Sequence, residues 1–516
     1  MEWTNDDDRQ YADALDWGID EDGEVVILAD PPPSVNGTRA AQDQPPPDDG
    51  GSDARTDTDG NAHATAVNTQ QIEIHRGQGR IAERLVAAYG DRLRYAHGLG
   101  WHIWDGARWA PDRDGAPQRA VWAVLRHALI NEVPYLTEPA RSQLVADVRR
   151  CETAAGVDGV LRIAANLRPV AVAAVQLDAD PWLFNLPNGT LDLRTGELRA
   201  HDPADLITRV AGCGYEPHAA GPVFDRFLAE VLPDPDVRAF VQRLLGSAMF
   251  GQVRDHVLPI LTGTGCNGKS TLVELVRDVF GDYGIAAEPE LLVERRGAHP
   301  TGQADLLGIR LATTTETDEG RRLAAATVKR LTGGDKIRAR RMARDFFEFR
   351  PSHTIIMVTN DLPKVQGDDP AIWRRIMVVP FDVVITAVDP ELPDRLRLEM
   401  PAVLAWLLDG YRAWQAAGGL RPPATVLGTT QAYREASDPI GRFLEGRTRS
   451  APGALVPART MYNAWVAWCQ ANGEQAGSEV SFAAYMGRRG ITKQRTRSGN
   501  KYVGVELRDE EDQAEQ

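Results

Sequence analysis

A glycine-rich stretch followed by lysine and serine is the part of this sequence with the clearest chemistry. Residues 263–270 read Gly-Thr-Gly-Cys-Asn-Gly-Lys-Ser and match the pattern G-x-x-x-x-G-K-[ST]. Glycines let backbone N–H groups curl around phosphate oxygens, while the lysine reaches the outer phosphates and the serine hydroxyl can ligate Mg²⁺. The pattern predicts a site for ATP and Mg²⁺. The expected binding residues are Gly263, Thr264, Gly265, Cys266, Asn267, Gly268, Lys269, Ser270 and Thr271.

The same glycines also fit the dinucleotide pattern G-x-G-x-x-G, which is weak evidence when it stands alone. The Lys269-Ser270 pair that follows at once favours a nucleoside triphosphate.

Three further polar positions lie beside apolar, strand-like runs. Glu316 follows the run 309–315 and is expected to polarise the attacking water and to help hold Mg²⁺, with Asp318 and Glu319 nearby. Asn360 follows the run 354–359 and can orient water near the γ-phosphate. Arg374 or Arg375, ahead of the run 376–379, could reach a neighbouring subunit's γ-phosphate. The alternatives are a solvated loop acid, a turn residue and a surface ion pair.

These positions need a scaffold of alternating strands and helices. The apolar run 257–261 precedes the glycine-rich stretch, a helix is expected over 271–280, and the runs 309–315, 354–359 and 376–379 are rich in β-branched residues. This alternation predicts an α/β fold with a parallel sheet covered on both faces. The ATPase domain is expected over residues 251–390.

The flanking regions have different compositions. Residues 1–60 hold 17 acidic and 3 basic residues, and 1–70 is predicted to be a disordered acidic tail. Turn signals at Asp105-Gly106 and Asn188-Gly189 predict hairpins in an otherwise α-rich module over 71–250. A helical connector (391–429), a winged-helix-like unit (430–505) and an acidic tail (506–516) are expected to follow. Trp465 and Trp468 have helical spacing and are predicted to lie in the core of that unit.

Two basic clusters are candidate DNA contacts, although the net charge of the chain is −15. The first lies within residues 321–350 and includes Lys329, Lys336, Arg338, Arg340 and Arg341, with a turn at Gly333-Gly334. We interpret it as a basic loop, with a charged surface helix as the alternative. The second consists of Arg488, Arg489, Lys493, Arg495, Arg497 and Lys501. It is interpreted as the wing of a winged helix, a fold that also binds proteins.

Several classes of protein are disfavoured by composition. No run of 18 or more apolar residues predicts a membrane span, and the acidic N-terminus does not look like a targeting segment. The four cysteines are far apart and contain no C-x-x-C pair, which disfavours a cysteine-rich zinc site and indicates a reducing compartment.

Taken in order, these motifs resemble the superfamily 3 helicases over about residues 90–505, and more closely the C-terminal part of phage and plasmid primases related to the poxvirus primase-helicase. The segment 181–198 resembles the family's N-terminal module. Residues 263–271 are similar to its Walker A motif, Glu316 to its Walker B acid, 329–340 to its B-prime motif, 355–360 to its motif C and 374–376 to its arginine-finger segment.

The resemblance implies an AAA+ core that assembles into a ring, usually a homohexamer, and moves along single-stranded or forked DNA, expected 3′ to 5′, at the cost of ATP. It implies roles for Lys269 and Ser270 at the phosphates and Mg²⁺, for Glu316 in hydrolysis, for Asn360 as a sensor and for Arg374 or Arg375 in trans. A phage, prophage or plasmid origin, the bacterial host cytoplasm and a separate primase or other replication proteins as partners are expected.

Two features depart from the family pattern. Glu316 is followed by Thr317, whereas other branches carry paired acids here. About 70 residues precede the predicted fold, too few for a primase-polymerase domain, so we do not expect primer synthesis by this chain. An origin-melting initiator or helicase loader that shares these motifs, and more weakly a primase subunit, remain the alternatives.

Overall fold

The computed structural model describes residues 75–294, 301–315, 321–340, 346–365, 369–497 and 499–508. Ahead of these it pairs two short antiparallel strands, β1 (Trp17–Ile19) and β2 (Val25–Ile27). The chain divides into two compact units, residues 1–95 with 112–171, and residues 96–111 with 172–516. Apart from β1 and β2, the tail 1–70 that was predicted to be disordered lies outside the described residues, as does most of the acidic tail 506–516. Among the described residues, no helix combines the length and apolar character that crossing a membrane requires.

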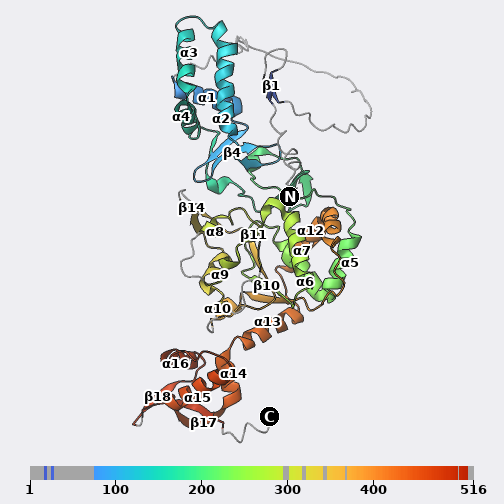
Figure 1. The fold of residues 1–516 in the computed structure, drawn as a ribbon, viewed down its shortest axis with the longest axis vertical. Helices are drawn as coiled ribbons and strands as arrows, with labels where there is room; N and C mark the ends of the chain where they lie inside the picture. The colour runs from blue at the N-terminus through green and yellow to red at the C-terminus, as the bar shows by residue number, and fades with distance from the viewer. Residues whose placement is uncertain are drawn as a thin grey trace, which may run out of the picture. The chain divides into compact units, whose positions relative to one another are not determined.

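The first unit is built from helices whose apolar positions recur every three to four residues. Ile81, Val121, Val148 and Val160 each contribute a fully buried side chain from a different helix. The helices are α1 (Gln78–Tyr89), α2 (Ala116–His127), α3 (Ala140–Cys151) and α4 (Ala154–Ala164). Figure 1 shows these four helices running close together. Two short strands, β3 (Leu93–Ala96) and β6 (Ala171–Val172), lie where the chain passes between the units.

The second unit begins with the two hairpins that the turn signals predicted. At the first turn, Asp105 Oδ1 accepts hydrogen bonds from the backbone N–H groups of Ala107 (2.9 Å) and Arg108 (2.8 Å). The strands are β4 (Gly100–Trp104) and β5 (Trp109–Pro111), then β7 (Leu183–Leu186), β8 (Gly189–Asp192) and β9 (Glu197–Arg199). The pairs β4–β5, β7–β8 and β8–β9 are all antiparallel, which confirms both hairpins.

A five-stranded parallel sheet forms the centre of this unit, as the strand and helix pattern predicted. Its strands are β10 (Leu258–Thr262), β11 (Gly284–Ala287), β12 (Leu311–Thr314), β15 (Thr354–Thr359) and β16 (Ile376–Pro380). The order across the sheet is β11-β12-β15-β10-β16, and every pair is parallel. The edge strand β11 was not predicted, because Gly-Ile-Ala-Ala carries little β-branched character.

Apolar side chains cover both faces of the sheet. Along β15, Ile356 and Val358 pack in one core, while Ile355 and Met357 pack in the other, as the two-residue period of a strand requires. The first core also contains side chains from α5 (Pro222–Val231), α6 (Pro235–Ser247), α7 (Lys269–Phe280), α11 (Leu392–Leu398) and α12 (Met400–Ala417). The second contains side chains from α8 (Thr301–Ala304), α9 (Ala325–Leu331), α10 (Pro370–Trp373) and the hairpin β13–β14 (Ile337–Arg340, Phe346–Phe349).

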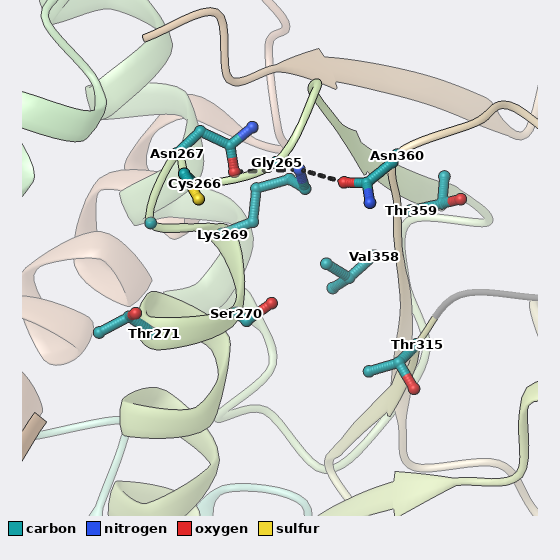
Figure 2. Close-up of a pocket in the computed structure, with 11 residues that line it drawn as sticks. Gly265, Cys266, Asn267, Lys269, Ser270, Thr271, Thr315, Val358, Thr359 and Asn360 are labelled. Carbon is teal, nitrogen blue, oxygen red and sulfur yellow. Dashed lines mark hydrogen bonds between the residues drawn. The ribbon is translucent and has the colours of Figure 1, made fainter. Parts of the chain in front are cut away.

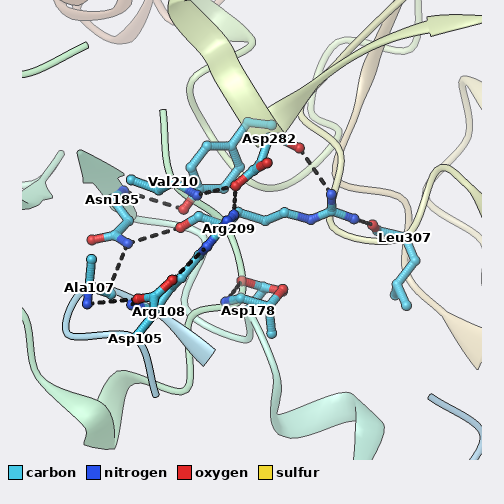
Figure 3. A network of polar contacts seen from close by, with 11 residues as sticks. Asp105, Ala107, Arg108, Asp178, Asn185, Arg209, Val210, Asp282 and Leu307 are labelled. Atoms are coloured by element: carbon cyan, nitrogen blue, oxygen red, sulfur yellow. Dashed lines mark hydrogen bonds and ion pairs between the residues drawn. The ribbon is translucent and has the colours of Figure 1, made fainter. Parts of the chain in front are cut away.

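A polar network attaches the hairpins to this sheet (Figure 3). Arg209 donates hydrogen bonds to the backbone oxygens of Asp282 (3.1 Å) and Leu307 (2.7 Å). The Asp282 carboxylate also pairs with Arg108 of the β4–β5 turn. Asn185 of β7 donates to the backbone oxygen of Arg209 at 2.9 Å. Because Asp282 follows the end of α7, the hairpins are fixed to the helix that begins at the glycine-rich stretch.

Three helices and a three-stranded antiparallel sheet form the end of the chain. After α13 (Ala424–Ala436), the elements are α14 (Pro439–Arg447), β17 (Thr448–Pro457), α15 (Ala458–Ala471), α16 (Glu479–Arg488), β18 (Lys493–Thr496) and β19 (Gly499–Leu507), with the sheet order β17-β19-β18. Trp465 and Trp468 stack with ring centroids 5.5 Å apart and are both buried. Their prediction as core residues is confirmed.

The stability of the fold is expected to depend on pH through His353. This side chain is fully buried at the start of β15, where Nε2 lies 3.2 Å from the Leu331 backbone oxygen, and burial lowers its pKa to about 4. In the unfolded chain the pKa of this histidine is about 6.5. Between about pH 6.5 and pH 4, His353 is therefore protonated in the unfolded chain and neutral in the folded one. His353 therefore destabilises the fold progressively as pH falls from about 6.5 to about 4, by up to about 3 kcal/mol.

Urea unfolding of the wild type and of His353→Leu at pH 7 and pH 4.5 measures this contribution. The variant is expected to lose less stability than the wild type between the two pH values. An equal loss in both proteins would show that His353 is not the group responsible.

Candidate nucleotide-binding site

The loop between β10 and α7 is shaped by close approaches that exclude side chains. A Cβ at Gly263 would lie 2.2 Å from Asn267 Nδ2 and 2.3 Å from the Phe381 backbone oxygen. Gly268 precedes the first residue of α7 with φ +77°, and a Cβ there would lie 2.4 Å from Val231 Cγ1. Glycine is therefore required at both ends of this loop, for steric room at the first and also for backbone conformation at the second.

Lys269 is held at the centre of the loop (Figure 2). It is only 3% exposed. Its amine donates to the backbone oxygen of Gly263 (2.8 Å), to Asn267 Oδ1 (3.0 Å) and to Asn360 Oδ1 (3.2 Å). These acceptors are neutral, and Asn360 comes from the end of β15. The structure thus places a positive charge between the carboxyl ends of two adjacent strands.

A cavity of about 350 Å³ opens in front of this lysine. It is lined by Gly265, Cys266, Asn267, Gly268, Lys269, Ser270, Thr271, Thr315, Val358, Thr359 and Asn360. The backbone N–H groups at the start of the 12-residue helix α7 and the ammonium group suit an anion such as a polyphosphate. A cavity at the carboxyl ends of parallel strands is also where open α/β sheets bind ligands.

The chemistry of the donor groups fits Mg²⁺ bound together with phosphate. Ser270 is exposed at the first turn of α7, and its hydroxyl and that of Thr315 place hard oxygen donors on the cavity wall. Among the described residues, no group of three or more His, Cys, Asp or Glu side chains could hold a metal by itself. Magnesium ions commonly keep several water ligands and share phosphate oxygens, so a few protein oxygens suffice.

Most predicted nucleotide-binding residues meet at this cavity. Residues 265–271 and Asn360 line it, while Gly263 and Thr264 begin the loop. Thr315, Val358 and Thr359 also line the cavity but were not predicted. The signal that could have found them is their position, because Thr315 directly precedes Glu316, and Val358 and Thr359 directly precede Asn360. Glu316, with Asp318 and Glu319, lies outside the described residues, so its predicted role stays a prediction.

Arg374 and Arg375 lie at the opposite end of the sheet. They precede β16, which runs parallel to β10 over five paired positions, so they are about 16 Å from the carboxyl ends of the strands. Arg374 is exposed, and its Nε donates to the Pro370 backbone oxygen at 3.3 Å. Arg375 is half-buried and donates from Nη1 to the Ala371 backbone oxygen at 2.9 Å. Neither side chain lines the cavity of its own chain.

The first basic cluster contains a short hairpin, β13–β14, as well as the helix α9 that carries Lys329. In β13, Ile337 and Ala339 are buried, whereas Arg338 and Arg340 are exposed on the opposite face. Their guanidinium groups lie 4.6 and 5.0 Å from the ring centre of Phe346, which is 49% exposed on β14. Basic and aromatic groups therefore share one exposed face.

The other members of this cluster differ in their surroundings. Lys336 is 62% exposed and lies 4.0 Å from Glu348. Lys329, on α9, pairs with Asp369 at the start of α10. Arg341 lies outside the described residues.

The second basic cluster lies on α16 and on the hairpin β18–β19. Arg489 pairs with Asp438, the N-cap residue of α14, so its charge is used within the fold. The Arg488 guanidinium lies 4.2 Å from the ring centre of Tyr485, and the Lys493 amine 5.1 Å from that of Tyr502. Arg495 and Arg497 are exposed near the turn of the hairpin, and Lys501 is partly exposed on β19.

Comparisons with known families match two segments of the chain. Residues 82–233 match the family described as "D5 N terminal like". Residues 261–375 match a family described as "Family of unknown function (DUF5906)". The second segment contains the glycine-rich loop, Asn360 and the two arginines.

The chain is also similar to proteins of large DNA viruses. It is 30% identical over 231 residues to "Putative helicase L207/L206" of Acanthamoeba polyphaga mimivirus, covering 43% of this chain and 24% of the relative. It is 25% identical over 384 residues to "Putative helicase 022R" of Frog virus 3, covering 57% and 39%. It is 24% identical over 348 residues to "Putative primase C962R" of African swine fever virus, covering 61% and 36%. The chain thus spans well under half the length of these relatives.

Among solved structures, the A form apo structure of the NrS-1 C-terminal region matches with a TM-score of 0.46 and 10% identity, covering 84% of this chain and 100% of the other. The two family matches and the viral relatives confirm the predicted resemblance to the superfamily 3 primase-helicases.

Proposed function

Because this chain carries a D5-like N-terminal segment and resembles the superfamily 3 primase-helicases, we propose that it is an ATP-dependent DNA helicase of a phage, prophage or plasmid replication system. In this proposal it has an AAA+ P-loop core and moves along single-stranded DNA as a ring, a homohexamer. The observation that carries the proposal is the buried Lys269 amine, held between the glycine-rich loop and Asn360 in front of the cavity.

The proposed chemistry is the hydrolysis of ATP. The loop N–H groups and the Lys269 ammonium bind and orient the outer phosphates, and Ser270 Oγ would hold the metal ion. When bound, Mg²⁺ would neutralise negative charge that develops on the phosphate oxygens. Asn360, whose side chain already lies 3.2 Å from the lysine amine, orients the attacking water, and Glu316 accepts its proton.

The proposal includes a second protomer, because Arg374 and Arg375 precede β16 at the end of the sheet opposite the cavity of their own chain. Both arginines donate to a backbone oxygen four residues earlier, but Arg374 is exposed while Arg375 is half-buried, so Arg374 is the better candidate for an arginine finger. A guanidinium supplied by the adjacent protomer would stabilise charge on the γ-phosphate.

We place single-stranded DNA on the exposed face of β13–β14. Phe346 offers a ring on which a base can stack, and Arg338 and Arg340 beside it can contact phosphates. The terminal unit would act as a winged helix, with Arg495 and Arg497 near its hairpin turn meeting duplex DNA at a fork.

Phe346→Ala is expected to weaken binding of single-stranded DNA by about 1–3 kcal/mol, roughly 5- to 150-fold, without changing its salt dependence. Arg338→Ala should also weaken binding and lower the slope of log K against log salt by about 0.7, because one phosphate contact is lost. Fluorescence anisotropy of a labelled oligo(dT) at several salt concentrations measures both quantities. Tyr135→Ala, an 85% exposed aromatic in the first unit, is the matched control. Unchanged affinity in Phe346→Ala would exclude this hairpin as the binding face.

Strand displacement on a forked substrate tests the overall proposal. A helicase releases the displaced strand in the presence of ATP and Mg²⁺. ATP hydrolysis without displacement would instead support an origin-melting initiator or a helicase loader. Primer synthesis from ribonucleotides by this chain alone would support the primase alternative.

A further inference from the structure

The helix α9 of the first basic cluster contacts the segment that carries Arg374 and Arg375, at the amino-terminal ends of the strands. The C-terminal end of α9 is tied to the starts of two strands, because His256 Nδ1 lies 2.9 Å from the Thr332 backbone oxygen and His353 Nε2 lies 3.2 Å from that of Leu331. Lys329, on the same helix, pairs with Asp369 at the start of α10. These contacts fix α9 beside the amino-terminal ends of the strands, at the end of the sheet opposite the cavity.

Asp369 uses its two carboxylate oxygens for different purposes. Oδ1 accepts a hydrogen bond from the backbone N–H of Ala371 at 2.9 Å and so caps α10. Oδ2 accepts from the Lys329 amine. The hydrogen bond from Lys329 is the largest cause that holds the pKa of Asp369 below its usual range. One side chain thus connects α9 to the first turn of α10.

The helix capped in this way leads directly to the arginines. α10 has four residues, and the Arg374 N–H bonds to the Pro370 backbone oxygen at 3.1 Å. Trp373, the last residue of α10, also holds this turn in place. Its ring packs edge-on against that of Tyr433, with ring centroids 5.3 Å apart. A single helical turn has little stability of its own, so its direction depends on its cap and its packing.

We infer that Lys329 is a positioning residue: through Asp369 it fixes the turn that presents Arg374 to the neighbouring protomer, instead of contacting a DNA phosphate as its sequence position predicts. The inference rests on the proposed function. The contact between α9 and α10 then links two functional parts of the chain. α9 leads into the basic hairpin β13–β14, and α10 leads into Arg374 and Arg375.

The exposure of the pair decides what its loss would do. Lys329 and Asp369 are 34% and 40% exposed. Pairs of this kind contribute little to global stability, so variants are expected to fold. The effect on the rate of ATP hydrolysis is expected to be larger than the effect on stability, because catalysis requires the Arg374 guanidinium at one position.

Lys329→Met, which keeps the chain length and removes the charge, is the first test. The kcat of DNA-stimulated ATP hydrolysis is expected to fall about tenfold, since a misplacement of ~1 Å can cost up to about 10²-fold. KM for ATP and the salt slope of oligo(dT) binding should not change. Lys336→Met is the matched control. Lys336 is 62% exposed beside the hairpin proposed to bind DNA, so loss of one phosphate contact there should lower the salt slope by about 0.7. A similar fall in slope for Lys329→Met would overturn the inference.

Asp369→Asn keeps the helix cap and removes the charge that Lys329 requires. It should reproduce the loss of kcat, and the double variant should be no worse than either single variant, because all three remove the same contact. Additive losses in the double variant would contradict a shared role.

Mixed assemblies separate a positioning role from a general defect. Lys329→Met protomers have intact cavities but a loosened Arg374, whereas Lys269→Ala protomers have an intact arginine turn. Mixing the two should raise hydrolysis per Lys329→Met protomer several-fold above the unmixed variant. No rise, while the parallel mixture of Arg374→Ala with Lys269→Ala does rise, would overturn this inference alone. No rise in either mixture would overturn the proposed role of Arg374 in trans, and the inference with it.

Discussion

Lys269→Ala is expected to lower kcat for ATP hydrolysis by about 10²- to 10³-fold, the usual cost of removing one fixed donor from developing negative charge. The loss should be large because the ammonium group is 3% exposed and is oriented by three oxygen acceptors. A charge held in this way acts in a site with little water to screen it.

Steady-state hydrolysis with and without oligo(dT) measures this effect. The variant should still bind single-stranded DNA, since the basic hairpin is separate from the cavity, and strand displacement should be lost together with hydrolysis. Thermal unfolding close to that of the wild type is the control for folding. If the variant retained DNA-stimulated ATP hydrolysis, the assignment of this cavity as the ATP site would be wrong.

Arg374→Ala is expected to reduce kcat by at least about 10²-fold, because arginine fingers contribute 10³- to 10⁵-fold in related phosphoryl-transfer enzymes. ATP binding should change little, since the residue precedes β16 at the end of the sheet opposite the cavity of its own chain. Arg375→Ala is the adjacent control and should have a smaller effect, because Arg375 is half-buried whereas Arg374 is exposed.

Complementation shows whether Arg374 acts in trans. Protomers carrying Arg374→Ala retain their own cavities, so mixing them with Lys269→Ala protomers should restore part of the activity that neither has alone. Mixing either variant with itself gives the baseline. Wild-type hydrolysis by Arg374→Ala, or a larger loss in Arg375→Ala, would contradict the choice of Arg374.

Local signals in the sequence predicted a large part of the fold. The glycine-rich pattern, the hairpin turns at Asp105-Gly106 and Asn188-Gly189, and the β-branched runs all correspond to observed elements. Each depends on residues close together in the chain, through backbone conformations that glycine and asparagine favour or through the burial of alternate side chains. Asn360 was also predicted, because it directly follows a strand whose carboxyl end had to face the site.

The arrangement of these elements was decided by contacts between distant residues. The edge strand β11 pairs beside β12 although its own residues give little strand signal. The hairpin β13–β14 forms where charge alone allowed a helix, because Ile337 and Ala339 are buried under the sheet.

By itself, the sequence determined which residues could hold a triphosphate and that a parallel sheet would carry them, since both follow from spacing along the chain. Only the tertiary structure decided that Lys269 meets Asn360 across 91 positions and that Lys329 pairs with Asp369 across 40. Partners so far apart are selected by the packing of whole strands and helices, for which no local pattern exists.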